Sequence, residues 1–294
     1  MYVIVFDIGG TDIKYGVMDQ RTDKLVYKNK IPTEIHLGRG AFLDKLATIA
    51  KDLKKKYKAE GVGISCAGSV DSNQAKIVTA PESIPEFQDI NFRQWMKEQV
   101  KLPCSAENDV NCFGLAEGKW GNAVGLKNYL TMTVGTGIGG AVVIDGNLIR
   151  GQEFNAGEFG RMYIDEKKFE SLASVTALIN YAKELGLEDI RSGLDVFNLF
   201  DKGNKLAVQA VYAFYHNLAK GVANLIYIFN PERILIGGGV STRGKFLDEL
   251  SAHLRLVLSN RFIPTARIAT TKLGNDSGMY GAYIHFMNQH KIGG

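Results

Sequence analysis

The chain has 294 residues, of which 45% are hydrophobic and 22% are charged, with Pro at 6 positions. This composition belongs to a globular protein with a sizeable core, and it excludes disordered and collagen-like chains. The 35 basic and 31 acidic residues are interspersed, with a formal net charge of +4. The charge balance therefore gives no reason to expect a nucleic-acid partner.

The sequence also speaks against secretion and membrane insertion. No apolar run approaches the ~18 residues that a membrane span needs, and Met1–Phe6 enters an apolar run without a basic leader. Cys66, Cys104 and Cys112 lie in or beside apolar stretches and form no CxxC pair. We therefore expect buried, reduced thiols in a cytoplasmic protein without a membrane partner.

The first residues read as a β-meander. Short apolar runs predict strands at Tyr2–Phe6, Ile13–Met18 and Lys24–Lys28, and a turn at Asp7–Thr11 joins the first two. Apolar residues spaced by three or four then predict an amphipathic helix over residues 40–58. Its lysines are typical of a solvated helix face rather than a nucleic-acid patch.

The middle of the chain repeats the strand–turn–strand pattern. Two runs rich in β-branched residues, Tyr129–Val134 and Gly140–Ile144, are joined by a glycine-rich turn, and Asp145-Gly146 is typical of a hairpin. Because the same order occurs near residue 9 and near residue 137, we expect an internal duplication of a phosphate-loop hairpin. Before it, the sequence predicts a strand at Gly61–Ala67, a short strand after Pro103, and a helix over Val110–Glu117.

The C-terminal half alternates helices with short strands. This alternation predicts the α/β class, with a domain boundary near residues 110–120. The expected helices are Phe169–Leu185, Leu194–Gly203, Lys205–Phe229, Phe246–Leu258 and Gly278–Gln289, and the expected strands are Arg233–Ile236 and Ile268–Lys272.

Two glycine clusters imitate nucleotide-binding motifs. Gly135-x-Gly137-x-x-Gly140 has the dinucleotide-binding spacing, but that motif must open a helix, and the following residues read as a strand. Gly239–Lys245 nearly matches a P-loop, but Phe246 stands where a Ser or Thr hydroxyl must bind magnesium. We reject both interpretations.

The two Gly/Thr turns that remain could each bind phosphate. Glycine lets successive N–H groups converge on an anion, and Thr11 and Thr136 add hydroxyl donors. Asp7 precedes the first turn, where a carboxylate can hold Mg²⁺ through water. Taken singly, each motif also fits an ordinary tight turn.

Six motifs in a fixed order give the sequence a family likeness. They are Asp7–Lys14, Gly63–Asp71, Glu107–Asn111, Thr133–Gly140, Ile236–Val240 and Leu273–Ala282. With them, the chain resembles the ROK family (repressors, open reading frames and sugar kinases) of the actin-like ATPase superfamily. The resemblance implies a two-domain, ribonuclease H-like fold with a central cleft. The small domain would be residues 1–112 plus 277–294, and the large domain residues 113–276.

The resemblance implies an ATP-dependent sugar kinase that phosphorylates a hexose or hexoside, most simply on its 6-hydroxyl, with ATP and Mg²⁺ as cofactors. Gly238 and Gly239 would border the adenosine, and Asp7 would hold Mg²⁺ through water. The full set of expected nucleotide-binding residues is Asp7, Gly9, Gly10, Thr11, Lys14, Gly135, Thr136, Gly137, Gly238 and Gly239.

The resemblance also assigns the sugar site. Asp109 would be the catalytic base, a role that suits a carboxylate placed at the attacking hydroxyl, although its position also fits a plain helix cap. Asn108 and Gly68 would contact the sugar. Glu158 would bind the hydroxyls nearer the anomeric carbon, with Arg161 beside it.

The sequence departs from the family pattern at two linked places. Arg161 stands where family glucokinases usually have a His that binds both sugar and zinc, and Glu170–Ser174 replaces the cysteine-rich zinc loop. Ala173 occupies the apparent place of a second sugar-binding Glu. We expect no zinc and a sugar pocket that admits a substituted anomeric group, such as a β-glucoside. Arg161 could equally form a structural ion pair with a neighbouring acid.

Two other functions stay open. One is a non-catalytic ROK-type sugar-sensing regulator, but the first motif begins at Asp7, where such repressors carry a helix-turn-helix, so we expect no DNA binding. The other is a catalytically silent sugar-binding protein, which the presence of Asp7, Asp109 and both Gly/Thr turns disfavours. The resemblance further implies a homodimer.

Overall fold

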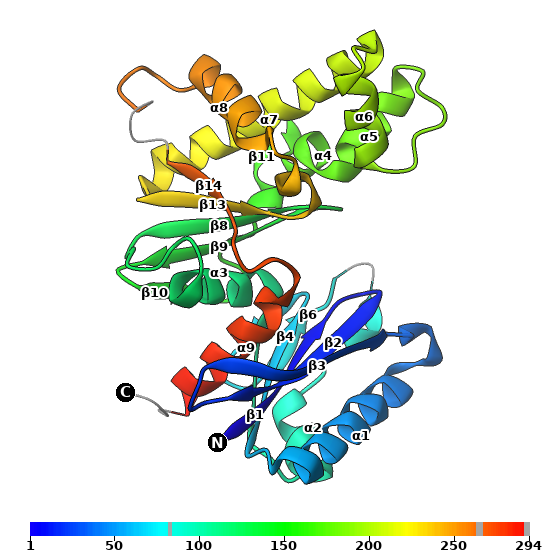
Figure 1. Cartoon of the computed structure of the whole chain (residues 1–294), viewed down its shortest axis with the longest axis vertical. Coiled ribbons are helices and arrows are strands. Elements are labelled where there is room, and N and C mark those ends of the chain that lie inside the picture. The colour runs from blue at the N-terminus through cyan, green and yellow to red at the C-terminus, as the bar shows by residue number, and fades with distance from the viewer. Residues whose placement is uncertain (82–83, 263–266, 291–294) are drawn as a thin grey trace. The chain divides into compact units, whose positions relative to one another are not determined.

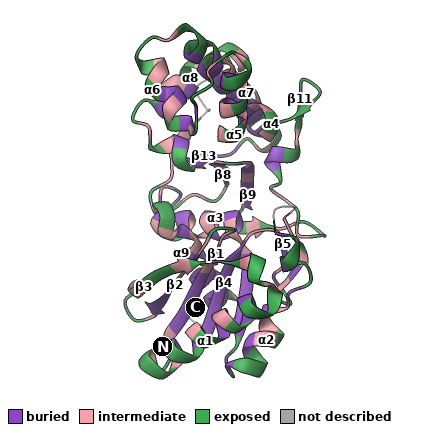
Figure 2. Cartoon of the chain, turned by 90° about the vertical axis from the view of Figure 1, so that its right-hand side faces the viewer, coloured by how far each residue is buried: buried purple, intermediate pink, exposed green. Residues whose placement is uncertain are grey.

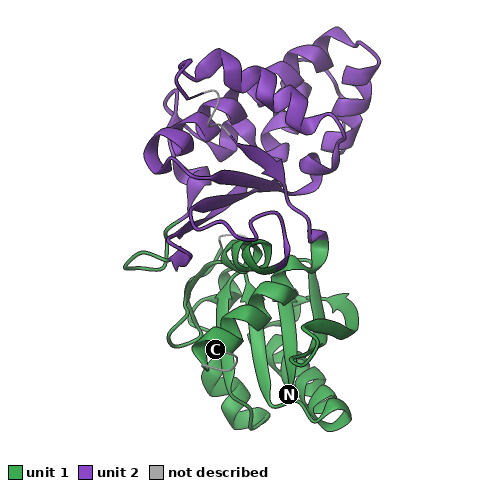
Figure 3. Cartoon of the chain, turned by 60° about the vertical axis from the view of Figure 1, so that its left-hand side comes forward, with its two compact units in different colours: residues 1–119, 150–156, 275–294 green, residues 120–149, 157–274 purple. Residues whose placement is uncertain are grey.

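The computed structural model describes the chain apart from residues 82–83, 263–266 and 291–294, and it divides into two compact units (Figure 3). Unit 1 contains Met1–Lys119, Arg150–Ala156 and Asn275–Gly294; unit 2 contains Trp120–Ile149 and Gly157–Gly274. Each unit has its own sheet with helices, so the predicted α/β class is confirmed. In the part of the chain that the structure describes, no helix is both long and apolar enough to cross a bilayer.

Unit 1 is built on a five-stranded sheet in the order β3-β2-β1-β4-β7, of which β1 to β4 are labelled in Figure 1. The first three strands form an antiparallel meander, and β1, β4 and β7 are parallel. Strand β4 is buried along its whole length, and β1 is buried except at Tyr2 and Asp7, which are half-buried (Figure 2). The strand bounds are β1 Tyr2–Ile8, β2 Asp12–Asp19, β3 Lys24–Pro32, β4 Gly61–Cys66 and β7 Cys104–Asn108.

Helices cover both faces of this sheet. Helix α1 (Arg39–Tyr57) buries Phe42 and Leu46 against the side chains of β1 and β4 that point to its face. The next residues along each strand point the other way, toward helix α9 (Ser277–Gln289). Gly63 allows this close packing, because a Cβ there would lie 2.5 Å from Ala282 O. The remaining elements of unit 1 are α2 Phe92–Gln99, α3 Asp109–Trp120 and the hairpin β5 Ser69–Asp71 with β6 Lys76–Thr79.

Unit 2 repeats the same sheet order with different strands. Its order is β10-β9-β8-β13-β14, again two antiparallel pairings followed by two parallel ones. The predicted second strand–turn–strand is therefore confirmed. The strand bounds are β8 Tyr129–Val134, β9 Ile138–Ile144, β10 Asn147–Ile149, β13 Arg233–Gly237 and β14 Ile268–Thr270, with a small hairpin of β11 Tyr163–Ile164 and β12 Lys167–Lys168.

The core of unit 2 is dominated by a long helix, α7 (Lys205–Phe229), which buries residues such as Phe214 and Leu218 among the other helices. The expected hairpin dipeptide is confirmed, since Asp145 and Gly146 both have positive φ between β9 and β10. The other helices are α4 Glu170–Ala173, α5 Val175–Glu184, α6 Gly193–Asp201 and α8 Phe246–Val257, and the short 3-10 turns are η1 Ile35–Leu37, η2 Pro85–Phe87, η3 Phe159–Arg161, η4 Gly239–Thr242 and η6 Gly274–Asp276.

One expected helix is divided. The sequence predicts a continuous helix over Phe169–Leu185, but α4 ends at Ala173 and α5 begins at Val175. Ser174 lies between them in an extended conformation, and its hydroxyl accepts the N–H of Ala177 at 3.0 Å. A serine cap of this kind starts a new helix, because it satisfies a backbone donor that a continuous helix would bond internally.

Candidate active site

The carboxyl ends of the parallel strands of unit 1 carry a row of polar residues. Asp7 of β1 pairs with Ser65 of β4, and Ser65 pairs with Glu107 of β7. Residues in register across neighbouring strands point to the same face of a sheet. The three side chains therefore share the face that α9 covers. Asp109 lies two residues beyond Glu107 in the sequence.

Asp7 is held by two donors. Ser65 Oγ donates to Asp7 Oδ1 at 2.8 Å, and Lys14 Nζ lies 3.1 Å from Oδ2. Lys14 also donates to the backbone oxygen of Asn275 at 3.0 Å. Because both carboxylate oxygens already accept a hydrogen bond, Asp7 fits a hydrated Mg²⁺ held through water better than a directly bound ion.

The glycine turn after Asp7 is held by hydrogen bonds at its base. Gly9 N–H donates to Asp12 O at 3.0 Å. The side chain of Thr33 donates to Gly9 O at 2.7 Å, and its N–H donates to Thr11 O at 2.8 Å. Gly10 and Thr11 at the tip are exposed. The turn thus has a fixed base and an open tip, which is the geometry an anion-binding turn requires.

Asp109 begins helix α3, and its neighbour caps the helix. Asn108 Oδ1 accepts the N–H groups of Val110 at 2.9 Å and Asn111 at 3.0 Å. The capping role therefore falls chiefly to Asn108, while Asp109 Oδ1 accepts the N–H of Val110 at 2.9 Å. Asp109 lies in the first turn of α3, where the helix dipole stabilises its ionised carboxylate.

Gly68 is tied to Asn108. Asn108 Nδ2 donates to Gly68 O at 3.0 Å. Gly68 has φ of 99°, and a Cβ there would lie 2.5 Å from Thr79 O, so only glycine fits. Of the sequence-predicted site residues, Asp7, Gly9–Thr11, Lys14, Gly68, Asn108 and Asp109 all belong to unit 1.

The second glycine turn lies in unit 2 and is joined to a helix start. Gly135 N–H donates to Gly137 O at 3.0 Å, and Val175 N–H at the start of α5 donates to Gly135 O at 2.8 Å. Thr136 is exposed and lines a cavity of about 580 Å³, together with Ser174 and other residues of α4, α5 and α7. The turn therefore borders a hollow that could accept part of a ligand.

The residues expected near adenosine lie beside this turn. Gly238 has φ of 98°, and a Cβ there would overlap the backbone of Val134, the residue before Gly135. Both Gly238 and Gly239 are exposed. The chain at Gly238 thus passes directly over the end of β8, which only glycine permits.

Glu158 and Arg161 form an ion pair. Arg161 Nε lies 3.2 Å from Glu158 Oε2, and about half of each side chain is exposed. The alternative of a structural ion pair, raised from the sequence, is thus observed with Glu158 itself. An exposed pair of this kind contributes at most about 1 kcal/mol, so both groups can exchange it for a ligand.

The sequence interpretation missed Glu170. Its Oε2 lies 2.9 Å from where a Cβ would stand at Gly137 and 3.0 Å from the corresponding position at Gly160. Ala173, the apparent place of a second sugar-binding Glu in the resemblance, is fully buried. The segment therefore brings one carboxylate, that of Glu170, close to Gly137 and Gly160.

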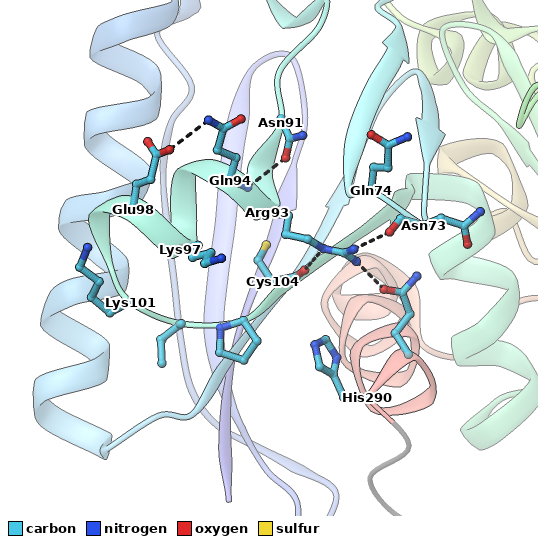
Figure 4. Close-up of a pocket in the computed structure, with 13 residues that line it drawn as sticks. Asn73, Gln74, Asn91, Arg93, Gln94, Lys97, Glu98, Lys101, Cys104 and His290 are labelled. Carbon is cyan, nitrogen blue, oxygen red and sulfur yellow. Dashed lines mark hydrogen bonds between the residues drawn. The ribbon is translucent and has the colours of Figure 1, made fainter.

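A further hollow in unit 1, of about 1450 Å³, is lined by residues such as Arg93 and His290 (Figure 4), and its lining includes none of the site residues named above. Arg93 joins its walls by donating to the backbone oxygens of Asn73 and Cys104 and to Gln289 Oε1. These bonds tie α2 to β7, to α9 and to the turn between β5 and β6. Because they connect elements of the scaffold, we assign Arg93 to the stability of unit 1.

The cysteines and metal ligands can also be placed. All three cysteines are buried and unpaired, as expected, and burial raises the pKa of each thiol well above its usual value. Across the described residues, we find no cluster of three or more His, Cys, Asp or Glu side chains suited to a metal ion.

Comparison with known proteins assigns the family. The model of the ROK family matches residues 3–289, so this chain belongs to the ROK family. It is 34% identical to a β-glucoside kinase of Klebsiella pneumoniae over 97% of this chain and 96% of the relative.

Solved structures agree with this assignment. The ROK hexokinase from Thermus thermophilus matches with a TM-score of 0.85 and 29% identity over the full length of both chains. A ROK family glucokinase from Streptomyces griseus, solved in complex with glucose and AMPPNP, matches with a TM-score of 0.80 and 27% identity over 96% of this chain and 98% of that one. The predicted actin-like ATPase fold is thereby confirmed.

Proposed function

We propose that this protein is an ATP-dependent sugar kinase that transfers the γ-phosphate of ATP to the 6-hydroxyl of a hexose or hexoside. The relatives support this, since they are named as β-glucoside kinases, a hexokinase and a glucokinase. The observation that carries the proposal is the position of Asp109 at the start of α3, next to Asn108 and Gly68. This arrangement offers a carboxylate beside two groups that can hold a sugar.

Asp109 would act as the general base. A carboxylate within hydrogen-bond reach of the sugar hydroxyl orients it and accepts its proton as the bond to phosphorus forms. Asn108 uses one N–H of its amide on Gly68, and its second N–H can donate to a sugar oxygen. Glu158 and Glu170 would accept hydrogen bonds from further sugar hydroxyls.

The nucleotide would be held by backbone N–H groups and by Lys14. Gly10 and Thr11 in unit 1, and Gly135–Gly137 in unit 2, offer exposed glycine-rich turns to phosphate oxygens. Asp7 would orient the water shell of Mg²⁺, and this ion supplies neutralisation of the phosphate charge when bound. Gly238 and Gly239 would border the adenosine.

We further propose a β-glucoside as the preferred substrate class. Arg161 stands where family glucokinases usually have a His. Its ion pair with Glu158 is exposed, so the guanidinium can leave Glu158 to bind a ligand. A guanidinium can donate to the oxygen of an anomeric substituent through several N–H groups. A substrate panel of cellobiose, glucose, N-acetylmannosamine and fructose tests this, and turnover of free glucose alone would contradict it.

Sugar-dependent release of ADP is the direct test of the kinase assignment. Asp109→Asn should lower turnover by at least about 100-fold while sugar binding stays within a few fold of the original. Asp44→Asn, on the exposed face of α1, is the matched control and should retain full turnover. Sugar binding without ADP release by the unaltered protein would instead favour the non-catalytic regulator.

A further inference from the structure

A short segment of unit 1 is inserted between two stretches of unit 2. Residues Arg150–Ala156 follow β10 directly and run into Gly157–Arg161, where Glu158 and Arg161 lie. Within the segment, Ala156 N–H donates to Arg150 O at 3.0 Å and closes it into a loop. Its two ends are therefore fixed to each other.

Arg150 anchors this loop to the strand that leads to Asp109. Its Nε donates to Glu107 Oε2 at 2.6 Å, and the Glu107 side chain is only 1% exposed. The other oxygen, Oε1, accepts the N–H of Asn108 at 2.9 Å and Asn111 Nδ2 at 3.0 Å. Charge-assisted bonds to a buried carboxylate are short and directional, so the pair fixes the end of β7 tightly.

A second anchor joins the other end of the loop to Ser69, the neighbour of Gly68. Asn155 Oδ1 accepts a hydrogen bond from Ser69 Oγ, and Gly68 O accepts one from Asn108 Nδ2. The contacts form a closed ring within unit 1 that runs through Glu107, Asn108, Gly68–Ser69, Asn155 and Arg150. Asn108 and Gly68, two of the residues proposed to hold the sugar, are part of this ring, and Asp109 follows Asn108 directly.

We infer that the Arg150–Glu107 ion pair is a positioning device for the proposed reaction: it sets Asn108, Asp109 and Gly68 in place and ties them to the loop that leads into Glu158. This inference rests on the proposed kinase function. Glu107 is buried and contacts protein groups on both oxygens, so it acts through Asn108 and Asp109 rather than on the substrate. His285 Nδ1 lies 3.9 Å from Glu107 Oε2, and the buried thiols of Cys66 and Cys112 also interact with this carboxylate.

The test compares Arg150→Met, Arg150→Lys, Glu107→Gln and the double variant R150M/E107Q, with Arg21→Met as control. Arg21 forms a similar pair with the buried carboxylate of Asp19 in the same unit. We expect kcat of Arg150→Met to fall about 10–100-fold and KM for the sugar to rise, with KM for ATP nearly unchanged. Arg150→Lys should recover part of the loss, because its ammonium can still pair with Glu107.

The double variant separates positioning from stability. Removing both charges avoids an unpaired buried carboxylate, so we expect thermal stability to recover toward the original while kcat stays low. Recovery of kcat together with stability, or equal losses in Arg21→Met, would overturn the inference. An unchanged kcat and an unchanged KM for the sugar in Arg150→Met would also overturn the inference.

The two proposals fail differently. If Asp109→Asn keeps full turnover, or the unaltered protein phosphorylates no sugar, the kinase assignment fails before the pair is examined. If Asp109→Asn is inactive and Arg150→Met is fully active, the kinase assignment stands and the positioning inference alone is wrong.

Discussion

Gly278 lies directly against the carboxylate of Asp7. A Cβ at position 278 would stand 2.8 Å from Asp7 Oδ2 and nearer still to Oδ1. Helix α9 can therefore cover the end of β1 only with a glycine at this point of its first turn. Gly278 of the last sequence motif and Asp7 of the first motif are therefore in direct contact.

Gly278→Ala should displace the Asp7 carboxylate. We expect kcat to fall at least about tenfold and the free energy of unfolding to fall by about 1–3 kcal/mol, as for other overpacked sites. Gly40→Ala is the control, because it lies in α1 with open space around a Cβ and alanine favours a helix. Steady-state kinetics and urea unfolding measure both effects, and full activity of Gly278→Ala would show that Asp7 can move without consequence.

Asp7→Asn should weaken the dependence of the reaction on Mg²⁺. The amide keeps the shape but loses the charge that orients the ion's water shell and pairs with Lys14. We expect a fall in kcat of about 10–100-fold and a higher Mg²⁺ concentration for half-maximal rate. Asp12→Asn, which breaks an exposed pair with Lys30, should leave the Mg²⁺ titration unchanged; the same shift in both variants would argue against a specific role for Asp7.

Glu170→Gln should raise KM for the sugar by about tenfold, because a charged acceptor near Gly137 and Gly160 is replaced by a neutral one. KM for ATP should change less than KM for the sugar. Glu188→Gln, an exposed residue after α5, is the control. A larger effect on ATP than on sugar would assign Glu170 to the nucleotide instead.

Stability should fall in mild acid through His285. Burial lowers the pKa of this imidazole to about 4, whereas the unfolded chain protonates it near its ordinary value of about 6.5. The unfolded state therefore takes up the proton first as the pH falls. Above pH ~6.5 His285 is neutral in both states, and stability is unaffected. As the pH falls from there toward 4, the free energy of unfolding decreases, and this loss reaches about 2 kcal/mol at pH 5.

His285→Gln should flatten this part of the stability profile between pH 7 and pH 5. His36→Gln, at an exposed site, should leave the slope unchanged. Urea unfolding at several pH values measures the slope, and an unaltered slope in His285→Gln would refute the assignment.

Local patterns predicted the elements that local sequence determines. The turn after Asp7 and the hairpin at Asp145-Gly146 follow from strand alternation and turn chemistry, and the sequence placed both correctly. It missed the break at Ser174, because apolar spacing continues across it and the decisive feature is one side-chain cap. Helix α2 was also missed, since it is only eight residues long.

The sequence predicts which residues belong to the candidate site, but it does not predict the contacts that hold them in place. Asp109 and Asn108 were assigned roles from a motif, yet their support by Arg150 depends on a pairing between distant parts of the chain. The spacing of apolar residues along the sequence does not indicate such a pairing. Glu170 was overlooked for the same reason, because its nearness to Gly137 and Gly160 exists only in the folded unit.

The repeated sheet order has a consequence for the residues that the two glycine turns can carry. In each hairpin we compare the second residue pair from the turn. In unit 1 this pair is the oppositely charged Asp7 and Lys14, whereas in unit 2 it is Thr133 and Gly139. Two identical chains related by a twofold axis must present the same residues at both places. Two hairpins on one polypeptide are free of that constraint, so one can carry an ion pair while the other stays neutral.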